Sequence, residues 1–122
     1  MSGKDNYLLD TNTIIDFLAA LLPSKATFWV ENAIHEKHIC TSIINKIEVL
    51  GFNANIEEED SLTYFITSIA VLPLTDAIAE KTIQLRKQKK IKLPDAIIDA
   101  TAIVNNLTIG LCSHFQKTPK WI

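Results

Sequence analysis

Apolar and polar positions along the chain predict short buried strands that alternate with amphipathic helices. Four apolar runs are typical of strands: 7–9, 38–41, 70–74 and 108–112. Between them, apolar residues recur every three or four positions, as on the buried face of a helix. Six helices are predicted. The first runs from Asp10 to Leu22, the second from Pro23 to about His35, and the third covers 43–50. The last three begin near Asn55, after Thr75 and at Leu93.

Helix starts and stops are marked by local signals. Asp10, Ser42, Asn55 and Thr75 stand where side-chain oxygens cap a first turn. Pro94 suits the first helical position of the last helix. These signals predict where each helix begins.

Strand–helix alternation throughout predicts a parallel sheet with helices on both faces. We expect four strands, with Trp121–Ile122 as a possible fifth edge strand. Right-handed crossovers bring the carboxyl ends of the strands to one edge, where open α/β sheets bind ligands. Asp10 is predicted to lie at that edge.

Composition limits the function classes. With 122 residues and 48% hydrophobic residues, the chain predicts one domain, 1–122, with a real core. A formal net charge of −2 excludes a domain that is basic as a whole, so any nucleic-acid contact must come from a local patch. The chain shows no apolar signal core and no run long enough to span a membrane. Two cysteines, Cys40 and Cys112, fit reduced thiols in the cytoplasm.

Four acids are the candidate chemistry: Asp10, Glu48, Asp95 and Asp99. Asp95 and Asp99 are four apart and share one face of the last helix, with Ile97, Ile98, Ala102 and Ile103 predicted on the core side. Carboxylates that converge without a cation repel one another unless they are protonated or bind metal. Oxygen ligands suit Mg²⁺ or Mn²⁺, which can activate water against a phosphodiester. The pattern leaves two simpler readings open: Asp10 as a plain helix cap, and Glu48 as a solvated helix acid.

A basic stretch also permits two readings. Five cations stand close together near the end of the fifth predicted helix: Arg86, Lys87, Lys89, Lys90 and Lys92. Cations favour the negative end of a helix. They also contact phosphates.

Three motifs together resemble the PIN domain family, and in particular VapC-type toxins of toxin–antitoxin pairs. They are Leu8–Asn12, Thr41–Gly51 and Leu93–Ala102, in the family's order and at its separations. The resemblance implies a three-layer α/β/α sandwich, Mg²⁺- or Mn²⁺-dependent RNA cleavage, a small VapB-type antitoxin partner and a homodimer. It implies metal ligation by Asp10, Glu48 and Asp95, with Thr11, Asn12 and Ser42 as supporting residues.

Two positions depart from the family pattern. Asn45 stands where the family often has Thr, and an amide can replace that hydrogen bond. In the tail, His114 precedes Phe115 where the family has its fourth acid. We therefore hypothesise that Asp99 partly replaces that acid, as a fourth catalytic residue.

Three alternatives to this enzyme follow from the same residues. The first is a PIN fold that has lost catalysis and binds a protein or RNA. The second is a haloacid-dehalogenase-type phosphatase, which lacks its second acid because Asn12 occupies that position. The third is a receiver-like domain, which needs an acid at the end of the third strand, where Leu74 stands.

Five residues predict an apolar surface for the homodimer: Phe17, Leu18, Leu21, Leu22 and Trp29.

Overall fold

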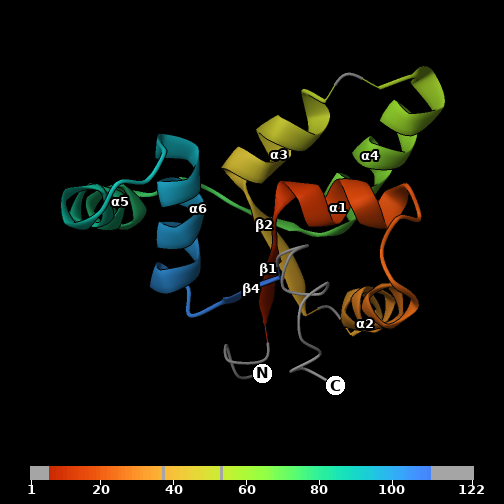
Figure 1. Cartoon of the computed structure of the whole chain (residues 1–122), viewed down its shortest axis with the longest axis horizontal. Helices are drawn as coiled ribbons and strands as arrows, with labels where there is room; N and C mark the ends of the chain where they lie inside the picture. The colour runs from red at the N-terminus through yellow and green to blue at the C-terminus, as the bar shows by residue number, and fades with distance from the viewer. Residues whose placement is uncertain (1–5, 37, 53, 111–122) are drawn as a thin grey trace.

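A computed structural model of the chain describes residues 6–36, 38–52 and 54–110. Within these residues, four parallel strands form one sheet in the order β3-β2-β1-β4 (Figure 1). The strands are β1 (Tyr7–Leu9), β2 (Ile39–Ser42), β3 (Ala70–Leu72) and β4 (Thr108–Gly110). The all-parallel sheet predicted from the sequence is confirmed.

Helices cover both faces of the sheet. They are α1 (Thr11–Leu18), α2 (Ser24–His35), α3 (Ile43–Leu50), α4 (Ile56–Ser68), α5 (Asp76–Gln88) and α6 (Leu93–Val104). Figure 1 shows α5 and α6 on one side of the strands and α1, α2 and α4 on the other. The arrangement is the predicted three-layer α/β/α sandwich.

The sheet separates two parts of the core because successive strand residues face opposite sides. Leu9 and Ile39 pack with residues of α1, α2 and α4, such as Ile14 and Phe65. Their strand neighbours Leu8 and Cys40 pack with Ile98 and Ala102 of α6. The core therefore holds α1 and α6 against opposite faces of β1.

The predicted helix caps are confirmed at four helix starts. Side chains of Asp10, Ser42, Asn55 and Thr75 accept hydrogen bonds from first-turn backbone N–H groups. Pro94 lies in the first turn of α6, one residue after the predicted first helical position, because the helix begins at Leu93. These local contacts set where the helices begin, and so where their first-turn side chains point.

The first helix is shorter than predicted. It ends at Leu18 rather than continuing to Leu22, and Ala20 then takes a positive φ of 60°. Leu22 is nevertheless buried because the turn, rather than a helix, brings it to the core. The prediction was right about burial and wrong about the backbone.

The predicted apolar surface is also wrong as a set. Leu22 is buried, and Phe17, Leu18 and Trp29 pack against the core, which leaves Leu21 as the exposed member. On α6, Ile103 was expected in the core but is 47% exposed. It lies in the last turn of α6, beyond the part that packs on the sheet.

Within the part of the chain that the structure describes, no helix is long and apolar enough to cross a membrane. Three sequence predictions lie outside the described residues: Cys112, His114 with the tail motif, and the edge strand at Trp121–Ile122.

Candidate active site

Asp10 lies at the carboxyl end of β1 and is the N-cap of α1. One of its carboxylate oxygens, Oδ1, accepts a hydrogen bond of 3.1 Å from the backbone N–H of Thr13. The Thr13 hydroxyl donates to the Gly110 carbonyl at 3.0 Å, which ties the start of α1 to the end of β4. Burial raises the pKa of Asp10, and the hydrogen bonds from Thr13 oppose that shift. The carboxylate is a helix cap and also lines a cavity.

Glu48 is held from a second element by a chain of side-chain hydrogen bonds. Thr11 donates its hydroxyl proton to Glu48 Oε1 and accepts a hydrogen bond of 3.1 Å from the Asn45 amide. Asn45 Oδ1 in turn accepts from the Ser42 hydroxyl at 2.7 Å and from the Ser42 backbone N–H at 3.2 Å. The Glu48 side chain is exposed to solvent and also lines the same cavity as Asp10. It is therefore both a solvated helix acid and an acid that faces the candidate site.

The directions of these bonds are determined by the chemistry of the groups. Because both Ser42 donors meet Asn45 Oδ1, the amide nitrogen faces Thr11. Since the Thr11 hydroxyl accepts from that nitrogen, its single proton points to Glu48. Asn45 and Ser42 are fully buried, so the chain has a rigid base. From sequence, Asn45 was recognised as a replacement for the family's Thr but was not counted among the site residues, although the Ser42-x-x-Asn45 capping-box spacing was a further local signal for it.

The last two acids come from α6, which begins at the same edge because it precedes β4 and runs opposite to it. Asp95 is exposed and Asp99 is half-buried. Burial raises the pKa of Asp99, the nearby charge of Asp95 adds to that shift, and the positive charge of Lys89 opposes it. The two α6 carboxylates are therefore close enough to influence each other.

All four predicted acids line one cavity of about 720 Å³, together with Thr11 and Asn12. Ser42 does not line it and acts through Asn45. The apolar walls of the cavity were not predicted as site residues: Ile15, Phe52, Ile91, Ile98 and Ile109. We call this space the acid cavity.

The donor set of the acid cavity fits Mg²⁺ or Mn²⁺. Its polar lining is made of carboxylate, hydroxyl and amide groups, and none of the lining residues is a cation. Among the described residues, no three His, Cys, Asp or Glu side chains stand close enough to hold an ion together. Mg²⁺ is suited to such a site because it keeps several waters and uses one or two carboxylates plus substrate phosphates.

The fold and this site place the chain in a known class. The PIN domain family matches residues 7–109, so the chain belongs to the PIN domain family. PIN domains are generally nucleases and generally use divalent metal ions.

Solved structures share this fold over most of its length. A chain of a toxin–antitoxin complex from Klebsiella pneumoniae is 29% identical, with a TM-score of 0.71 over 85% of this chain and 83% of that one. DNA-bound VapBC from Salmonella typhimurium has 22% identity and a TM-score of 0.70, covering 93% and 92%. FitAcB from Neisseria gonorrhoeae has 24% identity and a TM-score of 0.66, covering 84% of each. A comparison with curated protein sequences found no significant match.

Replacing Asn45 should test the hydrogen-bond chain. In Asn45→Ala, two buried Ser42 donors lose their acceptor, which should lower the free energy of unfolding by about 1–3 kcal/mol. The nuclease activity expected of a PIN domain should also fall, because Thr11 is no longer fixed against Glu48. Urea denaturation measures the first effect.

Asn55→Ala is the matched control, because Asn55 forms a capping box with Glu58 that is exposed and outside the acid cavity. It should cost about 1 kcal/mol and leave activity unchanged. If Asn45→Ala loses no more stability and activity than Asn55→Ala, the buried chain does not support the site.

Proposed function

We propose that this PIN domain is a Mg²⁺- or Mn²⁺-dependent endoribonuclease and the toxin of a toxin–antitoxin pair. The observation that carries the proposal is the acid cavity, which is lined by Asp10, Glu48, Asp95 and Asp99 at the carboxyl edge of the sheet. Four carboxylates with no cation among the lining residues are costly to keep together. A divalent metal and a phosphate-bearing substrate give that arrangement a use.

Each residue has a distinct proposed role. Asp10, Glu48 and Asp95 would hold a hydrated metal ion, one or two of them directly and the rest through bridging waters, since no three of the described acids stand close enough to bind it together. The bound metal would supply charge neutralisation at the phosphodiester and an activated water. Thr11 orients Glu48, and Asn45 with Ser42 orients Thr11. Asp99, whose raised pKa lets it hold a proton more readily than a solvated Asp, would partly replace the fourth acid of the family.

The proposed partners are RNA as substrate, a VapB-type antitoxin and a second copy of the chain, in the cytoplasm. The antitoxin is supported by the complexes among the solved relatives, one from Klebsiella pneumoniae and one a VapBC pair from Salmonella typhimurium. The RNA and the homodimer are supported by the sequence motifs that resemble VapC-type toxins.

Purified protein should cleave a single-stranded RNA or an exposed RNA loop when Mg²⁺ or Mn²⁺ is present. Cleavage should stop with EDTA and return when excess metal is added back. Gel analysis of an end-labelled RNA measures this, with a DNA strand of the same sequence run in parallel.

Two results would replace the proposal. RNA binding without metal-dependent cleavage would favour the catalytically inactive PIN module. Cleavage by the purified protein that persists in EDTA would contradict the metal-dependent mechanism, because the proposal assigns the activation of water to a bound metal.

A further inference from the structure

Positively charged residues are concentrated in one short segment beside the acid cavity. The sequence has 12 Lys and Arg residues and a net charge of −2, yet five of the cations lie within seven consecutive positions, 86–92. This segment joins the end of α5 to the start of α6, and all five cations are exposed. We call it the basic turn.

A helix dipole accounts for only part of the basic turn, because it favours Arg86, Lys87 and the C-cap Lys89 of α5 but not Lys92. Arg86 and Lys87 lie in the last turn of α5, where the negative helix end favours cations. Lys92, however, is the N-cap of α6, where the positive helix end disfavours a cation. In the described part of the chain, none of the five cations forms an ion pair. Their positive charge is therefore available to something outside this segment.

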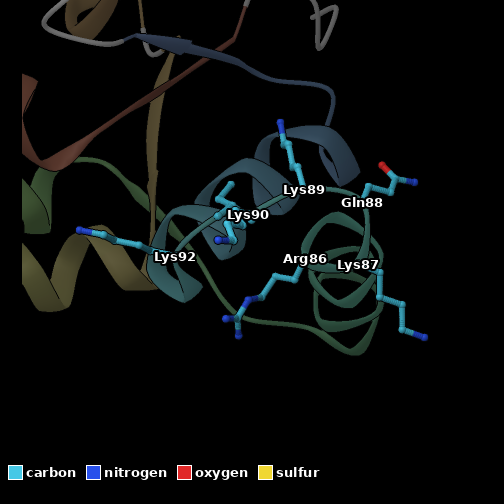
Figure 2. A pocket seen from close by; sticks show the side chains of 7 residues that line it. Arg86, Lys87, Gln88, Lys89, Lys90 and Lys92 are labelled. Atoms are coloured by element: carbon cyan, nitrogen blue, oxygen red, sulfur yellow. The ribbon is translucent and has the colours of Figure 1, made fainter.

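The basic turn lines a cavity of its own. Its seven residues surround about 690 Å³ of space, and Figure 2 shows their side chains fanning out from the turn, with Lys92 and Lys87 on opposite sides. Ile91 lines both this cavity and the acid cavity, so the two adjoin. Lys89 also acts electrostatically on Asp99 inside the acid cavity.

We propose that the basic turn holds the phosphate backbone of single-stranded RNA next to the bond that is cut in the acid cavity. This inference rests on the proposed function and adds to it the path of the substrate. The acid cavity alone repels a polyanion, because four of its six polar lining residues are acids and none is a cation. Exposed cations in the cavity that adjoins it offset that repulsion, as positively charged grooves do in proteins that bind single strands.

Of the five cations, Lys89, Lys90 and Lys92 are the best placed to contact an RNA strand that leads into the acid cavity. These three lie beyond the end of α5, on the segment that leads to α6 and its acids, whereas Arg86 and Lys87 lie on α5 itself. The three lysines are therefore the ones to change.

The test is a triple variant, Lys89→Ala with Lys90→Ala and Lys92→Ala. RNA binding is measured with a labelled oligonucleotide in EDTA, where no metal-dependent cleavage occurs, over a series of salt concentrations. Each lost phosphate contact lowers the slope of log K against log salt by about 0.7 for a single strand, so the slope should fall by about 2. In Mg²⁺ or Mn²⁺, KM for RNA should rise at least ~10-fold while kcat changes by less than about 3-fold.

Two controls separate charge from damage to the fold. Arg at the same three positions keeps the charge and should restore the salt slope. Lys25→Ala removes an exposed cation from α2, on the other side of the sheet, and should leave both KM and the slope unchanged.

Several results would overturn the inference. An unchanged salt slope in the triple variant would mean that the three lysines are solvated surface residues that do not contact RNA phosphates. Equal binding of duplex DNA, with the same loss in the triple variant, would make the turn a general polyanion site, and tighter binding of an acidic peptide would make it a protein contact. The wild type could bind RNA in EDTA with a salt slope that falls by about 2 in the triple variant, yet never cleave the RNA. In that case the proposed function fails while the binding role of the basic turn stands.

Discussion

Asp10→Asn should reduce the rate of RNA cleavage by at least ~10²-fold without unfolding the protein. The loss is expected because the change removes a charged metal ligand from the acid cavity. The fold should survive because Asn is as good an N-cap as Asp and can still accept from the Thr13 N–H. The change also removes a carboxylate that burial makes costly to ionise. Initial cleavage rates and melting curves of both proteins test the two halves of this prediction.

A matched control for Asp10→Asn is Asp60→Asn, which removes one exposed acid from α4. It should keep wild-type activity. If Asp10→Asn is as active as the wild type, either a contaminating nuclease does the cutting or the acid cavity is the wrong site. If the variant is inactive and unfolded, the cap matters more than the carboxylate, and Asp10→Ser, which keeps a capping oxygen, separates the two roles.

Helix starts were predictable from sequence because capping is local. Asp10, Ser42, Asn55 and Thr75 each bind a backbone N–H three residues on, so a short window of sequence contains both partners. The end of α1 was less predictable. An apolar period shows that Leu22 faces the core, but it does not show whether helix or turn carries the chain there.

The acids of the site were also predictable, and their surroundings were not. Asp10 could be placed because it ends a strand at the sheet edge, Glu48 and Asp95 because their motifs resemble a family, and Asp99 because it stands four residues after Asp95 on one helix. The contact between Asn45 and Thr11 joins residues 34 apart in sequence. The adjacency of the basic turn to the acid cavity, through Ile91, likewise depends on how α6 packs against the sheet. No local pattern encodes such contacts.

Mg²⁺ or Mn²⁺ should raise the melting temperature of the protein at neutral pH. A ligand that binds the native state at 100 times its Kd stabilises it by about 2.7 kcal/mol, which for a domain of this size is on the order of 10 °C. Asp95→Asn should remove most of that response, because it removes a proposed ligand. Asp99→Asn should remove a smaller part, if Asp99 helps to neutralise the metal without binding it directly.

Without metal, Asp99→Asn should raise the melting temperature, whereas with metal it should reduce the stabilisation that the metal gives. Burial raises the pKa of Asp99, so its ionised form costs folding free energy above that pKa, and the cost fades as the pH falls through it. Asp99→Asn should therefore melt at a higher temperature than the wild type in EDTA at neutral pH, with the difference shrinking under acid conditions. Scanning calorimetry of the wild type, Asp95→Asn, Asp99→Asn and the Asp60→Asn control, each in EDTA and in metal, measures all these shifts.

An Asp99→Asn variant that matches the wild type in both buffers and in cleavage would make Asp99 a solvated helix acid. His114→Ala, which lies outside the described residues, would then be the next variant to assay for the missing fourth acid.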